Sequence, residues 1–137
     1  MGTDGESPSR LRVVIADDDP VAREMVAAII ASDASLHLVA QCDDTASAVE
    51  SVLEHSPDVA VLDWVMPGGG GARAAKHIVR ERPHTAVVAL TAQDTEEASL
   101  DMMRSGARGF LVKGSPPAQL IDTIHTAARL TGSSRPA

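Results

Sequence analysis

The chain has 137 residues, of which 44% are hydrophobic and 23% are charged, and its formal net charge is −7. This length suits one domain with a substantial core, and the 12 Lys and Arg residues are scattered, so we expect no direct binding to nucleic acid. No apolar stretch approaches the roughly 20 residues of a membrane-spanning helix, and the start lacks the apolar segment of a signal peptide, which favours a cytoplasmic location without membrane contact.

Five short apolar runs divide the chain and are expected to be strands. They are rich in Val, Leu and Ala, as in strands buried on both faces of a sheet. The runs are residues 11–16, 36–41, 58–62, 85–90 and 108–112. Residues 1–10 are small and polar and predict a disordered leader, and residues 131–137 predict a similar tail or the start of a linker. The folded domain is therefore expected over residues 11–130.

Helical periodicity fills the segments between these runs. The apolar residues that would share one face of the first helix are Val21, Met25, Ala28 and Ile29. Leu100 and Met103 mark the fourth helix, and Asp94 with Glu97 fits a capping box at its start. Asp19 before a proline predicts the cap of the first helix. Five such strand–helix units predict an α/β fold, a parallel sheet with helices on both faces.

Five polar residues stand where an apolar run ends. They are Asp17, Asp18, Asp63, Thr91 and Lys113. If the runs are parallel strands of one sheet, all five lie at one edge, and ligands in open α/β sheets bind outside the carboxyl ends of the strands. Three carboxylates, a hydroxyl and an ammonium at one edge predict a site for a divalent cation and a phosphoryl group.

The chemistry of these side chains suggests separate tasks. Carboxylates about 4 Å apart repel by roughly 4 kcal/mol at an effective dielectric near 20, so Asp17 and Asp18 need a compensating cation, for which Mg²⁺ is suitable. Asp63 beside that cation could act as a nucleophile toward phosphorus and form an aspartyl phosphate. The hydroxyl of Thr91 could donate to a phosphoryl oxygen, and the ammonium of Lys113 could neutralise it.

In their order along the chain, these residues resemble the receiver domain of two-component response regulators. The matching residues are the acid pair Asp17-Asp18, Asp63 within DWVMPG, Thr91-Ala92, and Phe110 and Lys113 within GFLVK. The resemblance covers nearly all of the part expected to be ordered. It implies a flavodoxin-like (βα)₅ fold, a doubly wound five-stranded parallel sheet.

The resemblance also implies the role of each site residue. The ligands of Mg²⁺ would be Asp17, Asp18, Asp63 and the backbone carbonyl of Val65. Asp63 would accept a phosphoryl group from a histidine kinase or a phosphotransfer protein, and Thr91, Ala92 and Lys113 would bind the phosphoryl oxygens. The domain would then be a regulatory phosphoacceptor and not an enzyme with an outside substrate.

A switch is the further implication of the resemblance. Thr91 would move toward the phosphoryl group and Phe110 would turn inward, which remodels the face formed by the fourth helix, the strand 108–112 and the fifth helix. That face would bind a second copy of the chain or an output domain. The segment KGSPP after the last strand resembles receivers attached to LuxR-type helix-turn-helix domains. The chain is then either a stand-alone receiver or the receiver part of a longer protein.

Two alternatives remain open at this stage. A phosphatase of the haloacid dehalogenase type also uses Asp, Thr, Lys and Mg²⁺, and its Asp-x-Asp motif occurs here with Asp17 as the nucleophile. That reading leaves Asp63 without a role and leaves no room for a cap domain. A receiver-like interaction module that never takes phosphate is the second alternative, and the complete set of site residues argues against it.

Overall fold

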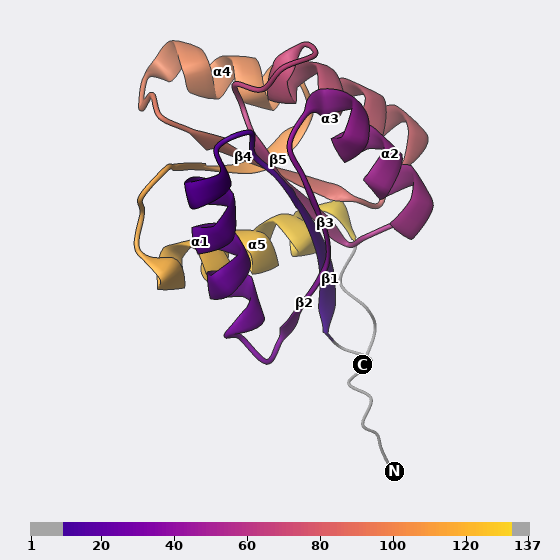
Figure 1. Cartoon of the computed structure of the whole chain (residues 1–137). Helices are drawn as coiled ribbons and strands as arrows, with labels where there is room; N and C mark the ends of the chain where they lie inside the picture. Colours follow the sequence, from indigo (N-terminus) through magenta and orange to yellow (C-terminus); the bar gives the residue numbers. More distant parts are fainter. Residues whose placement is uncertain (1–9, 133–137) are drawn as a thin grey trace.

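The computed structural model describes residues 10–132 as strands and helices that alternate along the chain (Figure 1). The strands are β1 (Leu11–Ala16), β2 (Leu36–Cys42), β3 (Val59–Asp63), β4 (Ala86–Thr91) and β5 (Ala107–Val112). The helices are α1 (Pro20–Ala31), α2 (Thr45–His55), α3 (Gly70–Glu81), α4 (Glu96–Arg104) and α5 (Pro117–Thr131). Each predicted strand is confirmed to within one residue at either end.

The predicted leader and tail fall almost wholly outside the described residues. Only Arg10 of the leader is described, and its guanidinium donates to the carbonyl of Leu36 at 2.9 Å. Helix α5 continues through Thr131, so it extends into the range expected for the tail. Residues 133–137 lie outside the described part. No helix within residues 10–132 combines the length and hydropathy needed to cross a membrane.

All five strands are parallel and lie in the order β2-β1-β3-β4-β5. The predicted doubly wound (βα)₅ sheet is therefore confirmed. After β1 the chain first builds β2 on one side, and then crosses to build β3, β4 and β5 on the other. This reversal leaves a crevice between the carboxyl ends of β1 and β3, which is where open α/β sheets bind ligands.

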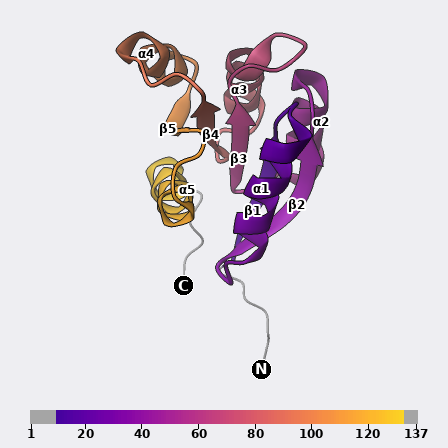
Figure 2. The same cartoon turned by 60° about the vertical axis from the view of Figure 1, so that its left-hand side comes forward.

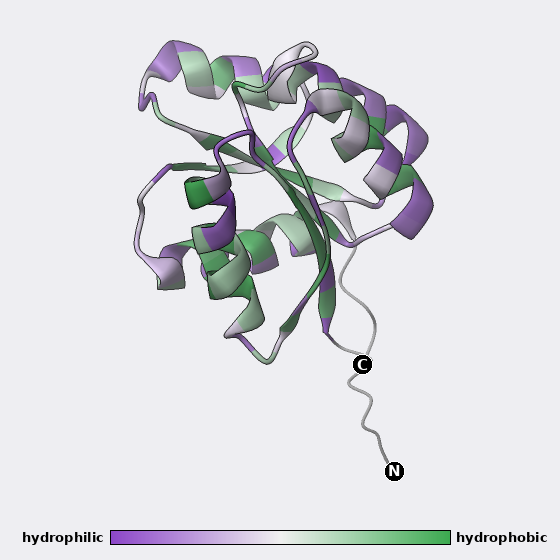
Figure 3. Cartoon of the chain, viewed as in Figure 1, coloured by the Kyte–Doolittle hydropathy of each residue, from purple (hydrophilic) through white to green (hydrophobic). Residues whose placement is uncertain are grey.

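Helices cover both faces of the sheet. Helices α1 and α5 lie on one face, and α2, α3 and α4 lie on the other (Figures 1 and 2). Successive strand residues point to opposite faces, so Val13 and Ile15 join the core under α1 and α5, while Val14 and Ala16 join the other core. Every residue of β3 and β4 is buried, and the sheet forms the apolar centre in Figure 3.

The face of α1 that meets the sheet differs from the prediction. Val21 and Met25 are exposed, whereas Ile30 is buried and Val26 packs against the core. Each of these pairs has the same four-residue spacing, so periodicity alone does not decide which side of the helix is buried. The predicted cap is confirmed, since the Asp19 side chain accepts a hydrogen bond from the first turn of α1.

Helix α4 also differs from the prediction in its cap and its buried face. Thr95, rather than Asp94, is the N-cap, and its hydroxyl accepts from the first turn. Leu100 and Met103 are exposed, and Met102 is the residue that α4 buries completely. The helix is therefore attached to the sheet through a narrow apolar stripe.

Candidate functional site

Three acidic side chains lie at the crevice between β1 and β3. Asp17 and Asp18 directly follow β1, and Asp63 is the last residue of β3. Their carboxylate oxygens lie within 4.8 Å of one another. Asp17 and Asp63 are buried while Asp18 is exposed, so the cluster opens to solvent on the side of Asp18. The predicted convergence of the three carboxylates is confirmed.

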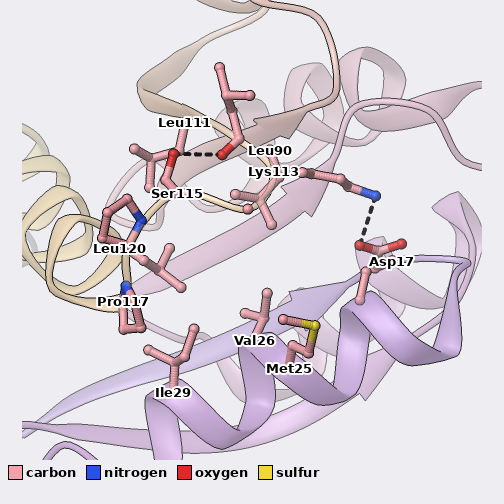
Figure 4. Close-up of a pocket in the computed structure, with 14 residues that line it drawn as sticks. Asp17, Met25, Val26, Ile29, Leu90, Leu111, Lys113, Ser115, Pro117 and Leu120 are labelled. Atoms are coloured by element: carbon pink, nitrogen blue, oxygen red, sulfur yellow. Dashed lines mark hydrogen bonds and ion pairs between the residues drawn. The ribbon is translucent and has the colours of Figure 1, made fainter.

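Lys113 joins the cluster from the residue that follows β5. Its Nζ lies 3.0 Å from Asp17 Oδ2, a pair drawn in Figure 4, and 3.1 Å from Asp63 Oδ2. Burial lowers the pKa of Lys113, but its contacts with Asp17 and Asp63 outweigh burial and hold that pKa above its usual value. Lys113 is therefore a charged ammonium that neutralises part of the carboxylate cluster.

Asp63 is a more basic carboxylate than an ordinary aspartate. Burial raises its pKa to about 6, against the lowering effect of Lys113 and with a further rise from the charge of Asp17. The backbone N–H of Val65 donates to Asp63 Oδ1 at 3.3 Å and fixes the carboxylate on that side. At neutral pH Asp63 is still ionised, so it can act as a nucleophile.

The donor set of the cluster fits a hard divalent cation. Asp17 Oδ1 accepts the N–H of Asp19 at 2.9 Å. Asp17 Oδ2 is buried and accepts no hydrogen bond of standard geometry from residues 10–132, although Lys113 Nζ lies 3.0 Å away. A buried carboxylate oxygen beside two further carboxylates is the kind of ligand that Mg²⁺ uses. The contribution of the Val65 carbonyl stays a prediction.

Thr91, predicted with Ala92 and Lys113 to bind the phosphoryl group, is the last residue of β4 and directly follows Leu90, the register partner of Asp63. The Thr91 hydroxyl donates to the carbonyl of Gln93 at 3.2 Å and accepts the N–H of Gln93 at 3.0 Å, so it is engaged within its own loop. Ala92 is exposed. Phe110 lies on β5 with 41% of its side chain exposed, outside the acidic cluster. The phosphoryl-binding and switch roles of these residues stay predictions.

Two contacts around the site have no counterpart among the sequence-based expectations. Arg23 Nη1, on α1, donates to the backbone carbonyl of Asp17 at 2.9 Å and so holds the loop after β1. Trp64 Nε1 donates to Asp101 Oδ2 on α4 at 3.0 Å. Trp64 and Asp101 are 37 positions apart, and no local pattern in the sequence connects them.

An apolar groove of about 330 Å³ opens beside the cluster, between α1 and α5 (Figure 4). Its apolar lining includes Met25, Ile29, Pro117 and Leu120. Asp17 and Lys113 form one wall of the groove, so the groove and the acidic cluster are continuous. A partner that fills the groove would therefore lie next to Asp17 and Lys113, the residue that pairs with Asp63.

Comparisons with known proteins agree with the fold. A family model described as the response regulator receiver domain matches residues 13–125. The chain is 34% identical over 122 residues to "Probable transcriptional regulatory protein NarL" of Mycobacterium tuberculosis, which covers 89% of the chain and 56% of that protein. It is 39% identical over 117 residues to "Oxygen regulatory protein NreC" of Staphylococcus epidermidis, with coverage of 85% and 54%.

The fold of the chain is also similar to that of a solved structure. The signal receiver domain of NarL from Mycobacterium tuberculosis has a TM-score of 0.85 and 34% identity, and the match covers 89% of this chain and 98% of that domain. The chain thus spans about half the length of the curated relatives it matches, and nearly all of an isolated receiver domain.

Proposed function

The chain belongs to the response regulator receiver domain family, and from this we propose that Asp63 is the phosphoacceptor of a two-component signalling protein. The phosphoryl donor would be a histidine kinase or a phosphotransfer protein. The observation that carries the proposal is the gathering of Asp17, Asp18 and Lys113 around Asp63 at the crevice between β1 and β3.

The proposed reaction is the transfer of a phosphoryl group from a phosphohistidine to Asp63. A carboxylate oxygen of Asp63 attacks the phosphorus, an O–P bond forms, the N–P bond breaks, and the released imidazole keeps the electron pair. Asp63 is in the required ionised form at neutral pH because its pKa is about 6. The ammonium of Lys113 lies beside the acceptor oxygen and would offset the charge of the incoming group.

Mg²⁺ is part of the same proposal. Asp17, Asp18 and Asp63 would hold the ion, with the backbone carbonyl of Val65 as a further ligand. When bound, the ion supplies charge neutralisation on the transferring oxygens. The chain keeps the two acids after β1 in position through Arg23, whose guanidinium holds the backbone carbonyl of Asp17.

The output surface would be the face formed by α4, β5 and α5. Large apolar side chains are exposed there, namely Met103, Phe110 and Leu130. Donation from the Thr91 hydroxyl to the phosphoryl group would replace the bond that it donates to the Gln93 carbonyl and move the loop that leads into α4. The occupant of this face would be a second copy of the chain or an output domain in a longer protein.

Intact-mass spectrometry tests the acceptor directly. After incubation with Mg²⁺ and acetyl phosphate, the wild-type chain should gain one phosphoryl group, and Asp63→Asn should gain none because the nucleophile is gone. EDTA should reduce the wild-type adduct. Asp43→Asn is the matched control, because Asp43 is an exposed carboxylate that follows β2 at the same edge of the sheet.

The same experiment separates the alternatives. A phosphatase that uses Asp17 would keep its adduct in Asp63→Asn and lose it in Asp17→Asn. An interaction module would show no adduct with acetyl phosphate or with phosphoramidate, and that result would contradict the proposal.

A further inference from the structure

We propose that Trp64 is a positioning residue that ties α4 to the loop after Asp63 and thereby favours the unphosphorylated arrangement. The inference rests on the proposed function, because α4 belongs to the face through which phosphorylation would be read. It assigns a specific contact to the link between the acceptor and that face.

The backbone of Trp64 is fixed on two sides, so its side chain starts from a rigid base. Its N–H donates to the carbonyl of Leu90 on β4 at 2.8 Å, and its carbonyl accepts the N–H of Gly71 on α3 at 3.0 Å. Trp64 directly follows Asp63. From this base the indole Nε1 reaches Asp101 Oδ2 in the second half of α4 at 3.0 Å.

Packing against α3 sets the orientation of the indole. A Cβ atom at Gly71 would lie 2.6 Å from Trp64 Cε3 and 2.8 Å from the carbonyl oxygen of Asp63. A glycine at this position therefore admits the ring between the β3–α3 loop and the first turn of α3. The half-buried indole also packs against the core under α2, α3 and α4. The hydrogen bond to Asp101 thus comes from a ring that packing has already placed.

Helix α4 is an element on which one polar contact can have a large effect. Its completely buried side chain is Met102, while Leu100 and Met103 are exposed. Its N-cap, Thr95, lies in the loop that directly follows Thr91, the last residue of β4. The bond from Trp64 therefore joins the second half of α4 to the end of β3. The first turn of α4 is instead connected to the loop after β4.

The hydrogen bond between Trp64 and Asp101, called the tether below, opposes the predicted movement of Thr91. To donate to a phosphoryl group on Asp63, the Thr91 hydroxyl must give up the bond that it donates to the Gln93 carbonyl, and the loop that continues into α4 would move with it. The Trp64–Asp101 bond resists a displacement of α4, so it stabilises the arrangement seen here. By linkage, a variant that lacks the bond should favour the phosphorylated arrangement.

The experiment compares three substitutions on α4. Asp101→Ala removes the acceptor, whereas Asp101→Asn keeps a side-chain oxygen that can accept from the indole. Glu97→Ala is the matched control, because it removes an exposed carboxylate from the same helix. With Mg²⁺ and acetyl phosphate, Asp101→Ala should be phosphorylated about fivefold faster, at the lower end of typical couplings between sites. Asp101→Asn and Glu97→Ala should stay near the wild-type rate.

A second measurement needs no phosphodonor. Trp64 is the one tryptophan of the chain, and the chain has no tyrosine, so its fluorescence anisotropy reports the mobility of this indole alone. Anisotropy should fall in Asp101→Ala, and the amides of α4 should exchange faster, while Asp101→Asn and Glu97→Ala should match the wild type. Trp64→Phe keeps an aromatic ring but lacks the donor, and it should reproduce the faster phosphorylation if Asp101→Ala folds poorly.

The outcomes separate this inference from the proposed function. If the wild type is phosphorylated and both Asp101→Ala and Trp64→Phe keep its rate or become slower, the tether is overturned and the phosphoacceptor proposal stands. If neither the wild type nor any variant takes up phosphate, the phosphoacceptor proposal fails, and with it the regulatory role of the tether. Unchanged anisotropy and α4 exchange in Asp101→Ala would show that the bond does not hold the helix.

Discussion

Asp63 links the proposed chemistry of the site to the stability of the fold, because this buried carboxylate would have to be ionised to accept a phosphoryl group. Burial raises its pKa to about 6, and the ammonium of Lys113 only partly offsets that effect. The carboxylate is therefore less stable in the folded protein than in water when it is charged. Burial of this carboxylate at the end of β3 therefore lowers the stability of the fold and makes the proposed nucleophile more basic.

This conflict predicts a pH dependence of stability in metal-free protein. Between about pH 4 and pH 6 the folded chain keeps the Asp63 proton and the unfolded chain loses it, so the free energy of unfolding falls as pH rises. The loss should be roughly 2 to 3 kcal/mol, at about 1.4 kcal/mol per pKa unit. Asp63→Asn should lack this part of the slope. Urea unfolding in EDTA, followed by far-UV circular dichroism across this range, measures the difference.

The control for this measurement is Asp43→Asn, whose exposed carboxylate lies outside the cluster. It should keep the wild-type slope, because its removal leaves Asp63 buried beside Asp17 and Lys113. A slope in Asp63→Asn equal to that of the wild type would contradict the link between Asp63 and stability.

Among the secondary-structure elements, α1 has one side in the core and another along the apolar groove. Its exposed residue Met25 lines the groove that continues into the acidic cluster. A phosphodonor protein that places its histidine at Asp63 would cover this groove, whereas a small phosphodonor would not need it. The two kinds of donor can therefore be separated by substitution in α1.

Met25→Asp is expected to slow phosphorylation by a protein donor about tenfold, which corresponds to about 1.4 kcal/mol of binding. The rate with acetyl phosphate should not change, because the substitution leaves Asp63 and its neighbours in place. Ala28→Asp is the matched control on the exposed surface of the same helix, outside the groove lining. Equal slowing with both donors would show that Met25 acts on the site itself.

The strands and the acidic cluster could be predicted because local sequence carries their signal. A strand buried on both faces is a continuous apolar run, and a polar residue such as Asp63 or Lys113 ends it visibly. The faces of α1 and α4 could not be predicted in the same way. Val26 and Ile30 compete with Val21 and Met25 at the same helical spacing, and the packing against the sheet decides between them.

Contacts between distant elements also escaped prediction. The bond of Trp64 to Asp101 depends on the angle at which α4 leaves its loop. A Trp or an Asp in the sequence does not by itself predict such a contact. The engagement of the Thr91 hydroxyl with Gln93 is local, but Thr is common in strands and loops and gives no distinct signal. Side-chain partners of this kind can be identified only when the fold is known.

At the scale of the whole molecule, ion binding and folding are coupled through mass action. Two helical layers enclose the sheet, and the acidic cluster forms only when β1, β3 and β5 lie in one sheet, with β4 between β3 and β5. The unfolded chain separates these residues and should bind a divalent cation weakly. A ligand that binds the folded form alone raises the free energy of unfolding.

Mg²⁺ should therefore stabilise the wild-type chain by about 2.7 kcal/mol at one hundred times its dissociation constant. Asp18→Asn should lower this gain, and the exposed position of Asp18 means that the substitution leaves the core intact. Urea titrations with Mg²⁺ or with EDTA measure the effect, and Asp43→Asn should respond like the wild type. The same gain in Asp18→Asn as in the wild type would exclude Asp18 as a ligand.

Lys113 affects whether folding or ion binding comes first. Its ammonium acts as a counterion that the chain itself provides, so the fold can form before any divalent ion arrives. This differs from small zinc domains, in which the metal supplies the folding free energy. A counterion that is covalently attached to the fold also stays at a high effective concentration next to Asp17 and Asp63. An arriving ion must compete with it, which favours weak binding and rapid exchange over permanent occupancy.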